Sequence, residues 1–451
     1  MYKKRIFLIL LIIFASNFIE AQQVLENIDK KTYELFQNKM YKKVIYVGEK
    51  AIKEGTDYFY LRSRIAISYF ELKNYRLAIY HFEKAMKFNS DDPTTLEYLY
   101  YAYILSGRNG DANLLTTKFP DYLKEKINYK RKYLNSVYLE GGPSLSNNVS
   151  KNGGLDIDGD TSLYGESDLN DKMIYFHFGL KHDLFPFLSI YHGFSNLNIS
   201  KRKTIMNSNQ DTAFNYTVKQ MEYYINADFQ LSKGLKFTPA FHFISVKADL
   251  TNASFDTINL KYIYQNSSLN LNNYVVSLGL TKEFKRISAN IFATYSNLNN
   301  SKQFQLGLSG TYFPFGNLDL YSNTTLALLN TKAKVVTPGS GGNREFRFIF
   351  DQMIGAKIIS DLWLEASVSV GNLANYNEKN AFIVYNIADK IKFKSGISAI
   401  YSLNNNFELS LRYQFLSRES SYINYTDSKS QQEILTNYQN NTIIGGIKWK
   451  L

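Results

Sequence analysis

Hydrophobic and polar residues alternate with a period of two along most of the chain from residue 135 onwards. The clearest segment is FELSLRYQF, residues 407–415, in which every second residue is apolar and the residues between them are polar or charged. Because successive side chains of a strand point to opposite faces, this pattern predicts a strand with one apolar and one polar face. The same alternation recurs in residues 221–231, 274–281, 362–371 and 391–403.

Two kinds of connection separate the predicted strands. Short ones lie near residues 185–186, 232–234, 285–286, 314–316, 360–361 and 404–406. Long polar ones lie near 147–172, 201–214, 251–269, 331–343 and 418–435, with shorter links near 298–302 and 375–389. Alternating turns and loops are typical of bacterial outer-membrane barrels, whose turns face the periplasm. They predict an antiparallel transmembrane β-barrel of about fourteen strands over residues 131–451. Its first strand, Tyr138 to Leu145, contains an interruption at Gly141, Gly142 and Pro143.

The first 21 residues have the layout of a secretory signal peptide. Lys3, Lys4 and Arg5 precede an apolar run from Ile6 to Phe14, and a polar stretch leads to Ala21. This order predicts export, with cleavage after Ala21. The alternative is an uncleaved anchor helix, for which the apolar run is short. No later segment has the ~20 consecutive apolar residues that a membrane helix needs, so a membrane-embedded chain must be a barrel.

A soluble β-sandwich shows the same alternation and is the competing fold. Three features favour the barrel: the signal peptide, predicted strands longer than ten residues, and aromatic residues crowded at the strand ends. The chain contains 36 Tyr and 32 Phe, whose rings suit membrane interfaces. The sequence therefore predicts a protein of the outer membrane, with its N-terminal domain in the periplasm.

Residues 22–130 are helical in period and repetitive. The segment around residues 59–92 has aromatic and small residues in a fixed order, namely Tyr69, Tyr75, Ala78, Phe82 and Ala85. A shift of 34 residues leads to Tyr103, Gly107 and Ala112, and a shift back leads to Leu35, Tyr41, Val44 and Ala51. This pattern resembles the tetratricopeptide repeat, in about three copies over 25–58, 59–92 and 93–120. The resemblance implies a periplasmic scaffold that binds a protein partner, with Asn74, Arg76 and His81 expected at its surface.

The chain ends in a strand pattern that places Ile447, Trp449 and Leu451 on one face. An apolar alternation running to the last residue resembles the C-terminal signal that the barrel-assembly machinery reads. That signal usually ends in an aromatic residue, whereas this chain ends in Leu451 with Trp449 two residues earlier. The resemblance implies the assembly machinery as a partner.

Charge and cysteine content exclude several classes of function. The net charge of +12 is spread along the chain, whereas a nucleic-acid-binding protein more often gathers its basic residues into a patch. The chain has no cysteine, which excludes disulfides, thiolate metal sites, a cysteine nucleophile and a lipid-modified N-terminal cysteine. Asp156, Asp158 and Asp160 have a calcium-like spacing without the rest of that motif, so an acidic loop is the preferred interpretation. No cofactor is predicted.

Catalytic residue types are present without a recognisable motif. The histidines are His81, His177, His182, His192 and His242. His177 and His192 fall on adjacent predicted strands, near Ser195, Asp183 and Glu166 in the sequence. A catalytic assignment requires mutual geometry that the sequence does not provide. Charged residues on the predicted lumen face, namely Glu222, Asp228, Arg347, Asp351, Glu365, Glu408 and Arg412, are expected to form polar networks that fill the barrel.

The layout of repeats followed by a barrel resembles the outer-membrane exporters of cellulose and related exopolysaccharides, which carry many more repeats. The resemblance implies a non-enzymatic barrel whose repeats recruit a periplasmic partner, for export of polysaccharide or another cargo or for envelope assembly. Two alternatives stay open. One is a barrel enzyme that modifies lipid A or glycan, and the other is a plugged structural or adhesion barrel that acts through its outer loops.

Overall fold

The computed structural model describes residues 25–147, 164–207, 210–256, 261–332, 344–387, 389–425 and 431–451. The predicted signal peptide and the three aspartates at 156, 158 and 160 lie outside the described residues. The chain divides into a helical unit, which ends at Lys130 and also takes in Phe313–Leu318, and a unit of strands, which comprises Arg131–Tyr312 and Asp319–Leu451. Among the described residues, no helix combines the length and the hydrophobicity that crossing a membrane requires.

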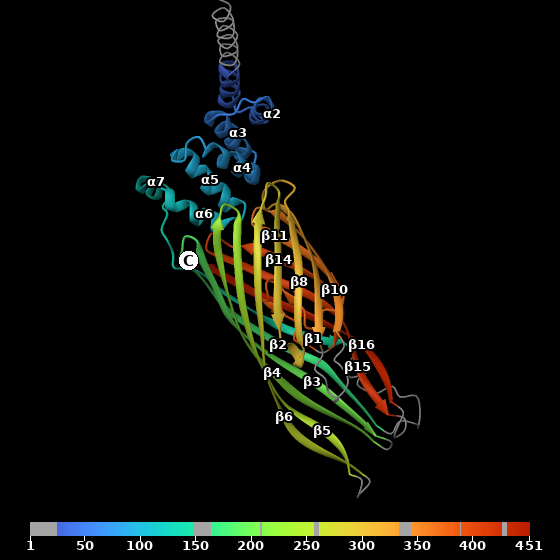
Figure 1. Ribbon diagram of the computed structural model, residues 1–451. Coiled ribbons are helices and arrows are strands. Elements are labelled where there is room, and N and C mark those ends of the chain that lie inside the picture. Colours follow the sequence, from blue (N-terminus) through green and yellow to red (C-terminus); the bar gives the residue numbers. More distant parts are fainter. Residues whose placement is uncertain are drawn as a thin grey trace, which may run out of the picture. The chain divides into compact units, whose positions relative to one another are not determined.

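The helical unit consists of antiparallel helix pairs at a constant interval (Figure 1). A helix over residues 25–37 is followed by α2 (Tyr41–Lys53), α3 (Phe59–Glu71), α4 (Tyr75–Ala85), α5 (Pro93–Leu105), α6 (Asn109–Leu115), a 3-10 turn η1 (Thr116–Lys118) and α7 (Asp121–Lys126). The second helices of the three pairs begin at residues 41, 75 and 109, each 34 residues after the one before.

Backbone and side chains repeat with the same period. The turns within the three pairs place Lys39, Lys73 and Gly107 in the left-handed region, with φ of 55°, 59° and 78°. Between neighbouring pairs, the Tyr69 hydroxyl donates to Glu49 (2.6 Å) and the Tyr103 hydroxyl donates to Glu83 (2.7 Å). Each repeat therefore joins the next through the same tyrosine–glutamate hydrogen bond.

Two residues expected at the surface of this unit are buried instead. Arg76 and His81 are each only 4% exposed. His81 lies against Arg62 (3.2 Å) and Glu49 (3.6 Å), in a polar network between helices. Asn74 has a local role, since its side chain accepts a hydrogen bond from the Leu77 backbone and caps α4. Helical periodicity did not reveal this network, because polar residues on a helix are usually assigned to its solvated face.

The hydrogen bond from His81 makes Glu49 a titratable link in this unit. It is the main cause that holds the pKa of Glu49 at about 2, below the ordinary value of a glutamate side chain, 4.5. A carboxylate whose pKa is lowered by folding stabilises the folded state above its unfolded pKa, and this stabilisation disappears as the pH falls towards 2. We expect the helical signal in circular dichroism to lose thermal stability between about pH 4.5 and pH 2. The loss should be smaller in Glu49→Gln and unchanged in Glu54→Gln, a glutamate paired only at the surface with Lys50.

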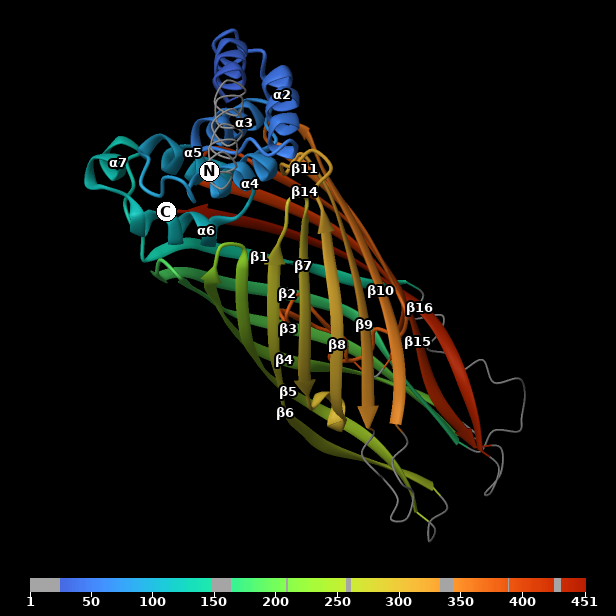
Figure 2. The ribbon, with the colours of Figure 1, turned by 45° about the horizontal axis from the view of Figure 1, so that its top comes forward.

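The second unit is a closed antiparallel barrel of fourteen strands, which confirms the predicted fold class (Figure 2). Its strands are β1 (Leu134–Asn147), β2 (Tyr164–Phe185), β3 (Leu188–Asn207), β4 (Gln210–Ser232), β5 (Leu235–Asp256), β6 (Lys261–Glu283), β7 (Ile287–Ser296), β8 (Lys302–Tyr312), β9 (Leu320–Lys332), β10 (Arg344–Ile359), β11 (Leu362–Val370), β14 (Lys390–Ser402), β15 (Phe407–Tyr425) and β16 (Gln431–Lys450). Two short strands, β12 (Asn377–Glu378) and β13 (Ile383–Val384), form a hairpin of their own.

The barrel closes where β1 pairs with β16. The predicted interruption of the first strand is absent, and β1 runs unbroken through Gly141, Gly142 and Pro143. Gly142 lies so close to β16 that a Cβ there would overlap the carbonyl of Ile443. Glycine is therefore needed here so that two backbones can approach closely. The sequence prediction had assigned these glycines to a break in the strand.

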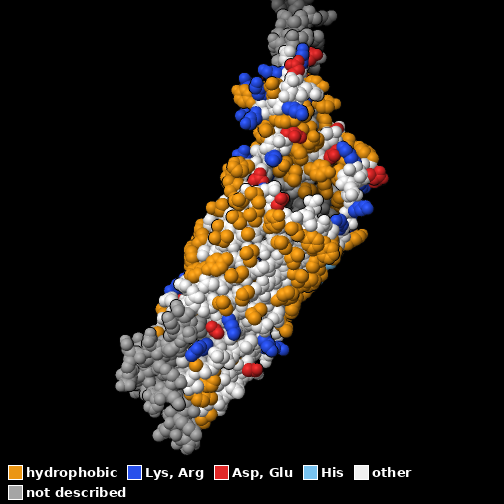
Figure 3. Space-filling view, turned by 180° about the vertical axis from the view of Figure 1, so that it is seen from behind, with side chains coloured by type: hydrophobic (Ala, Val, Ile, Leu, Met, Phe, Trp, Pro, Cys, Tyr) orange, Lys and Arg blue, Asp and Glu red, His pale blue; other side chains and the backbone are white. Residues whose placement is uncertain are grey.

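The two faces of the wall have the predicted polarity. Outward residues of β4 and β6 such as Met221 and Tyr274 are 51% and 38% exposed, while the inward Glu222 and Ser277 are 9% and 0% exposed. Figure 3 shows apolar side chains gathered over the wall with few charged ones among them. An apolar band around a closed barrel is the surface that lipid chains contact, so the unit is a transmembrane barrel of the outer-membrane type.

Several strands extend through segments predicted as loops. The predicted loops at 201–214, 251–269 and 418–435 consist largely of strand, because β3 to β6 and β15 continue into them. β4 and β6 have 23 residues each, whereas β7 and β11 have 10 and 9. Strand pairing depends on backbone hydrogen bonds, so a polar outer face does not end a strand that has left the membrane. The barrel wall is consequently much taller on the β3–β6 side.

Candidate functional site: the lumen and the loop that crosses it

The connection between β11 and β14 folds into the barrel. We call residues 371–387 the lumen loop. It begins at Gly371, whose φ is +118°, and carries the β12–β13 hairpin. The turn of that hairpin places Lys379, Asn380 and Ala381 at positive φ. Three consecutive non-glycine residues in this region are held by the contacts that the loop makes with the wall.

The wall holds the lumen loop from separate strands through hydrogen bonds to its backbone. His242 Nδ1 on β5 donates to the Ala381 carbonyl (2.7 Å). Gln305 Nε2 on β8 donates to Asn377 (2.8 Å), and Arg347 Nη1 on β10 donates to Ala374 (2.7 Å). These strands lie on different sides of the barrel, so the loop spans the lumen.

Apolar residues of the loop also pack on the wall. Leu373 and Tyr376 are buried against Ala327, Leu329 and Ile349. At the other end, Ala381 and Val384 pack with residues of β5 and β6. The Phe382 ring lies among His177, Tyr191 and Tyr224, with ring centroids 5.2 to 5.8 Å away. These contacts have the character of a folded core.

A buried ion pair joins the loop to β14. Lys394 Nζ lies 2.6 Å from Glu378 Oε2 and 3.8 Å from Asp351. The Tyr385 hydroxyl donates to the same Glu378 carboxylate (3.1 Å). The side chains of Lys394 and Glu378 are 8% and 14% exposed, so water screens their attraction weakly. A buried charge pair therefore ties the lumen loop to the wall.

The lumen loop divides the interior into two chambers. The turn-side chamber, about 350 Å³, includes Asn290, Asn323, Glu365 and Ser398, each close in sequence to a short turn. The loop-side chamber, about 390 Å³, lies on the other side of the loop and includes Asp168, Lys201 and Arg418. Four residues line both chambers, namely Ile383, Tyr385, Arg412 and Gln414.

The charged residues predicted on the lumen face all have polar partners. Arg412 lies 3.4 Å from Glu140, which also accepts a hydrogen bond from Tyr175 (2.8 Å). The other contacts are Glu222 with Gln220, Asp228 with Thr238, Arg347 with Thr331, Asp351 with Ser369, Glu365 with Tyr321, and Glu408 with Lys450. Within the described part of the chain, no group of three histidine or acidic residues has a geometry that would hold a metal ion.

Only part of the possible catalytic set comes together. His177 Nδ1 contacts Ser195 Oγ (2.9 Å), and its Nε2 contacts the Tyr191 hydroxyl (2.6 Å). His192 instead contacts His182 (3.2 Å). Asp183 accepts from Ser189 and Asn135, and Glu166 pairs with Lys203, so neither carboxylate orients His177. The Phe382 ring packs edge-on against His177. This histidine is therefore part of the barrel wall that the lumen loop contacts.

The residues singled out for repeat packing occupy the core of the helical unit. Ala78, Phe82, Ala85, Tyr103 and Ala112 are at most 1% exposed. Tyr69 and Tyr75 are partly buried against the same core, and Gly107 forms a left-handed turn. At the other end of the chain, Ile447 and Trp449 face outwards on β16, and the Leu451 backbone donates to Asn135 (3.0 Å).

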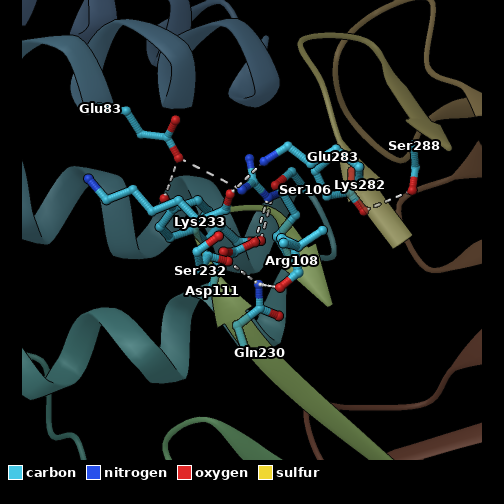
Figure 4. A network of polar contacts seen from close by, with 12 residues as sticks. Glu83, Ser106, Arg108, Asp111, Gln230, Ser232, Lys233, Lys282, Glu283 and Ser288 are labelled. Atoms are coloured by element: carbon cyan, nitrogen blue, oxygen red, sulfur yellow. Dashed lines mark hydrogen bonds and ion pairs between the residues drawn. The ribbon is translucent and has the colours of Figure 1, made fainter. Parts of the chain in front are cut away.

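Further polar contacts reinforce each unit separately. In the helical unit, Arg108 pairs with Asp111 (2.8 Å) and lies 3.8 Å from Glu83 (Figure 4). In the barrel, short turns are tied by Lys282 donating to the Lys233 carbonyl (3.2 Å) and by Ser288 donating to Glu283 (2.9 Å). These bonds satisfy polar groups within each unit.

No family model and no curated protein sequence matches the chain. Among solved structures, it is similar to the crystal structure of the P. putida toluene transporter TodX, with 10% identity and a TM-score of 0.44 over 77% of this chain and 93% of that one. The crystal structure of a Pseudomonas aeruginosa FadL homologue has 8% sequence identity and a TM-score of 0.45, with 70% of this chain and 90% of that one covered. A bacterial polysaccharide outer membrane secretin has 9% identity and a TM-score of 0.31, with 70% of this chain and 99% of that one covered. These likenesses concern fold and carry nothing about what this chain binds.

Proposed function

We propose that the chain is a non-enzymatic outer-membrane barrel that forms a passage closed by the lumen loop. The observation that carries this proposal is the loop itself, which crosses the lumen with a chamber on either side of it. Arg412 and Gln414 line both chambers, so displacement of one segment would join the two spaces. The loop is attached by hydrogen bonds, one ion pair and buried apolar contacts, none of which belongs to the strand pairing of the wall.

Planar-bilayer conductance tests this proposal. Wild-type protein should be nearly closed, and replacement of residues 375–387 by a short Gly-Ser linker should give large, steady conductance. The control is the same replacement of residues 333–343, which connect β9 and β10. Both variants must show the heat-dependent gel mobility of a folded barrel. A folded loop-deleted barrel that stays silent would support a plugged structural barrel in place of a passage.

We further propose that the helical unit is a stack of three tetratricopeptide-like repeats that recruits a periplasmic protein. The 34-residue helix interval, the left-handed turns and the repeated tyrosine–glutamate bonds support the repeat assignment. Tyr46 and Tyr60, 73% and 63% exposed, offer aromatic contacts of the kind enriched at protein interfaces. Such a scaffold would couple the barrel to a partner in export of polysaccharide or another cargo, or in envelope assembly.

Crosslinking in intact cells tests recruitment. The full-length chain should form discrete crosslinks to a periplasmic protein, and a chain lacking residues 25–130 should lose them while its barrel keeps heat-dependent mobility in the outer-membrane fraction. Tyr46→Ala and Tyr60→Ala should weaken the crosslinks without unfolding the helices, because both rings are exposed. Identical crosslinks from the barrel alone would contradict the scaffold role.

A further inference from the structure

Towards the loop end of β3 to β6, the outer face of the barrel wall changes from apolar to polar, and the inner face changes from polar to apolar. In the membrane band, Phe243 faces outwards at 39% exposure and the neighbouring His242 faces inwards at 1%. Towards the loop end of the same strand, Lys247 is exposed on the outer face, while Val246 and Ala248 are buried on the inner face at 7% and 6%. Above the membrane the outer face meets water, which accounts for its polarity. It does not account for an apolar inner face, of which the lumen loop covers only the part where Ala381 and Val384 pack with Val218, Val246 and Leu271.

The inward apolar residues form one continuous surface in the loop-side chamber. Strand register places Val218 directly opposite Ala248, Val246 opposite Leu271, and Ala248 opposite Leu269. We call this surface the apolar wall; its members on four neighbouring strands are Leu197, Val218, Val246, Ala248, Leu269 and Leu271. A contiguous apolar surface inside an otherwise polar lumen is costly to hydrate, and such surfaces mark ligand sites.

Across the same chamber lies a cation without a full set of partners. Arg418 on β15 lines the chamber, and its buried Nε and Nη1 atoms have no hydrogen-bond partner among the residues that the structure describes. Its guanidinium lies 5.9 Å from the Tyr438 ring. Buried guanidinium nitrogens are stabilised by carboxylate or phosphate oxygens, which accept two parallel hydrogen bonds from them.

The acidic residues of the chamber are engaged elsewhere. Asp168 pairs with Lys201 (3.1 Å), and Glu140 pairs with Arg412 (3.4 Å). Glu222 accepts from Gln220 (2.6 Å) and lies 3.4 Å from His242. The chamber therefore combines an apolar wall with an arginine whose charge no carboxylate of its lining takes up.

We propose that the loop-side chamber binds a small amphipathic anion, whose apolar body lies on the apolar wall and whose carboxylate or phosphate head contacts Arg418. This inference goes beyond the proposed passage, because binding in the chamber requires no movement of the lumen loop. Binding and conductance are separate measurements, so either idea can fail without the other.

Calorimetry on the full chain in lipid nanodiscs tests the proposal, with heats from empty nanodiscs subtracted. The probes are octanoate, octyl phosphate and octanol, which share a chain and differ in the head. We expect both anions to bind at least about tenfold more tightly than octanol, since a hydrogen bond to a charged group is stronger than one between neutral groups. The tighter of the two anions identifies the head that the site prefers.

Two substitutions separate the parts of the site. Arg418→Gln should abolish the advantage of the anions over octanol, whereas Lys219→Gln, which removes a charge from the outer face of β4, should leave it intact. Leu271→Asn should weaken the binding of all three probes by the same factor. Its control is Asn270→Ala, which changes an outward-facing neighbour. Heat-dependent gel mobility confirms that each variant is folded.

Three results would overturn the proposal. The first is a folded wild-type protein that binds none of the probes. The second is octanol binding as tightly as octanoate with no response to Arg418→Gln. The third is acetate or inorganic phosphate binding as tightly as the octyl anions, which would show a plain anion site in which the apolar wall has no part.

Discussion

Replacing Glu378 by glutamine is expected to open the barrel. The substitution leaves the Lys394 ammonium buried, and within the described part of the chain Asp351, at 3.8 Å, is then the only carboxylate paired with it. Removing one partner of a buried ion pair costs ~3–5 kcal/mol. The penalty falls on the closed position of the lumen loop, because the strands keep their own hydrogen bonds. A difference of ~3 kcal/mol shifts an equilibrium about 100-fold, so channel openings should become frequent in planar bilayers.

The control for this experiment is Glu365→Gln. Glu365 lines the same turn-side chamber but bonds to Tyr321 on the wall and makes no hydrogen bond to the loop. It should leave the barrel closed. The double variant Glu378→Gln, Lys394→Met should restore closure in part, because no unpaired charge is then buried. The ion pair would not control closure if the loop-deleted barrel conducted while the Glu378→Gln barrel showed no more channel openings than wild type.

Phe82→Ala is expected to unfold the helical unit at room temperature or close to it. The Phe82 ring is fully buried on α4 and stacks on Tyr98 at 6.0 Å. Truncating a buried phenylalanine costs ~3–5 kcal/mol through lost burial and the cavity that remains. In a repeat array the loss spreads, because each repeat is stabilised mainly by its neighbours. A unit of three helix pairs has too little folding stability to absorb this loss.

The measurement is the thermal loss of helical circular dichroism from the full chain in detergent. Phe88→Ala is the matched control, since that ring is 54% exposed on the same repeat. It should shift the midpoint by no more than a few degrees, whereas Phe82→Ala should remove most of the transition. Heat-dependent gel mobility should be unchanged in both variants. Loss of the barrel signal along with the helices would contradict the division into two units.

The strand order and the two faces of the wall follow from the sequence because a membrane imposes both. Lipid requires an apolar outer face, so Met221 and Tyr223 alternate visibly with Glu222. Where strands leave the membrane this requirement ends. The outward Asn266 and Ser268 of β6 then resemble loop residues, so the predicted loop at 251–269 included part of this strand. The inward Leu269 and Leu271 next to them keep the period of two, with the apolar residues now on the inner face.

The lumen loop was missed for a different reason. Residues 375–389 were assigned as a link because Asn377, Glu378 and Lys379 are polar, and local pattern does not show whether a loop folds inwards. One signal was present in the sequence. Ala381 to Tyr385, AFIVY, is apolar in a connection expected to face water. The partners of the loop, such as His242 and Gln305, are remote in sequence, so no spacing rule would identify them.

The contacts of the lumen loop also bear on how the protein assembles. His242 and Ala381 are 139 residues apart, and the Phe382 ring packs on strands from the opposite half of the barrel. Contacts between residues so distant in sequence form late, because both surfaces must first be in place. The loop therefore docks only once β2 to β5 and β10 to β14 stand in one wall. If the proposed passage exists, we expect a newly inserted barrel to conduct until the lumen loop docks, so that the docking rate of one loop sets how long the barrel stays open.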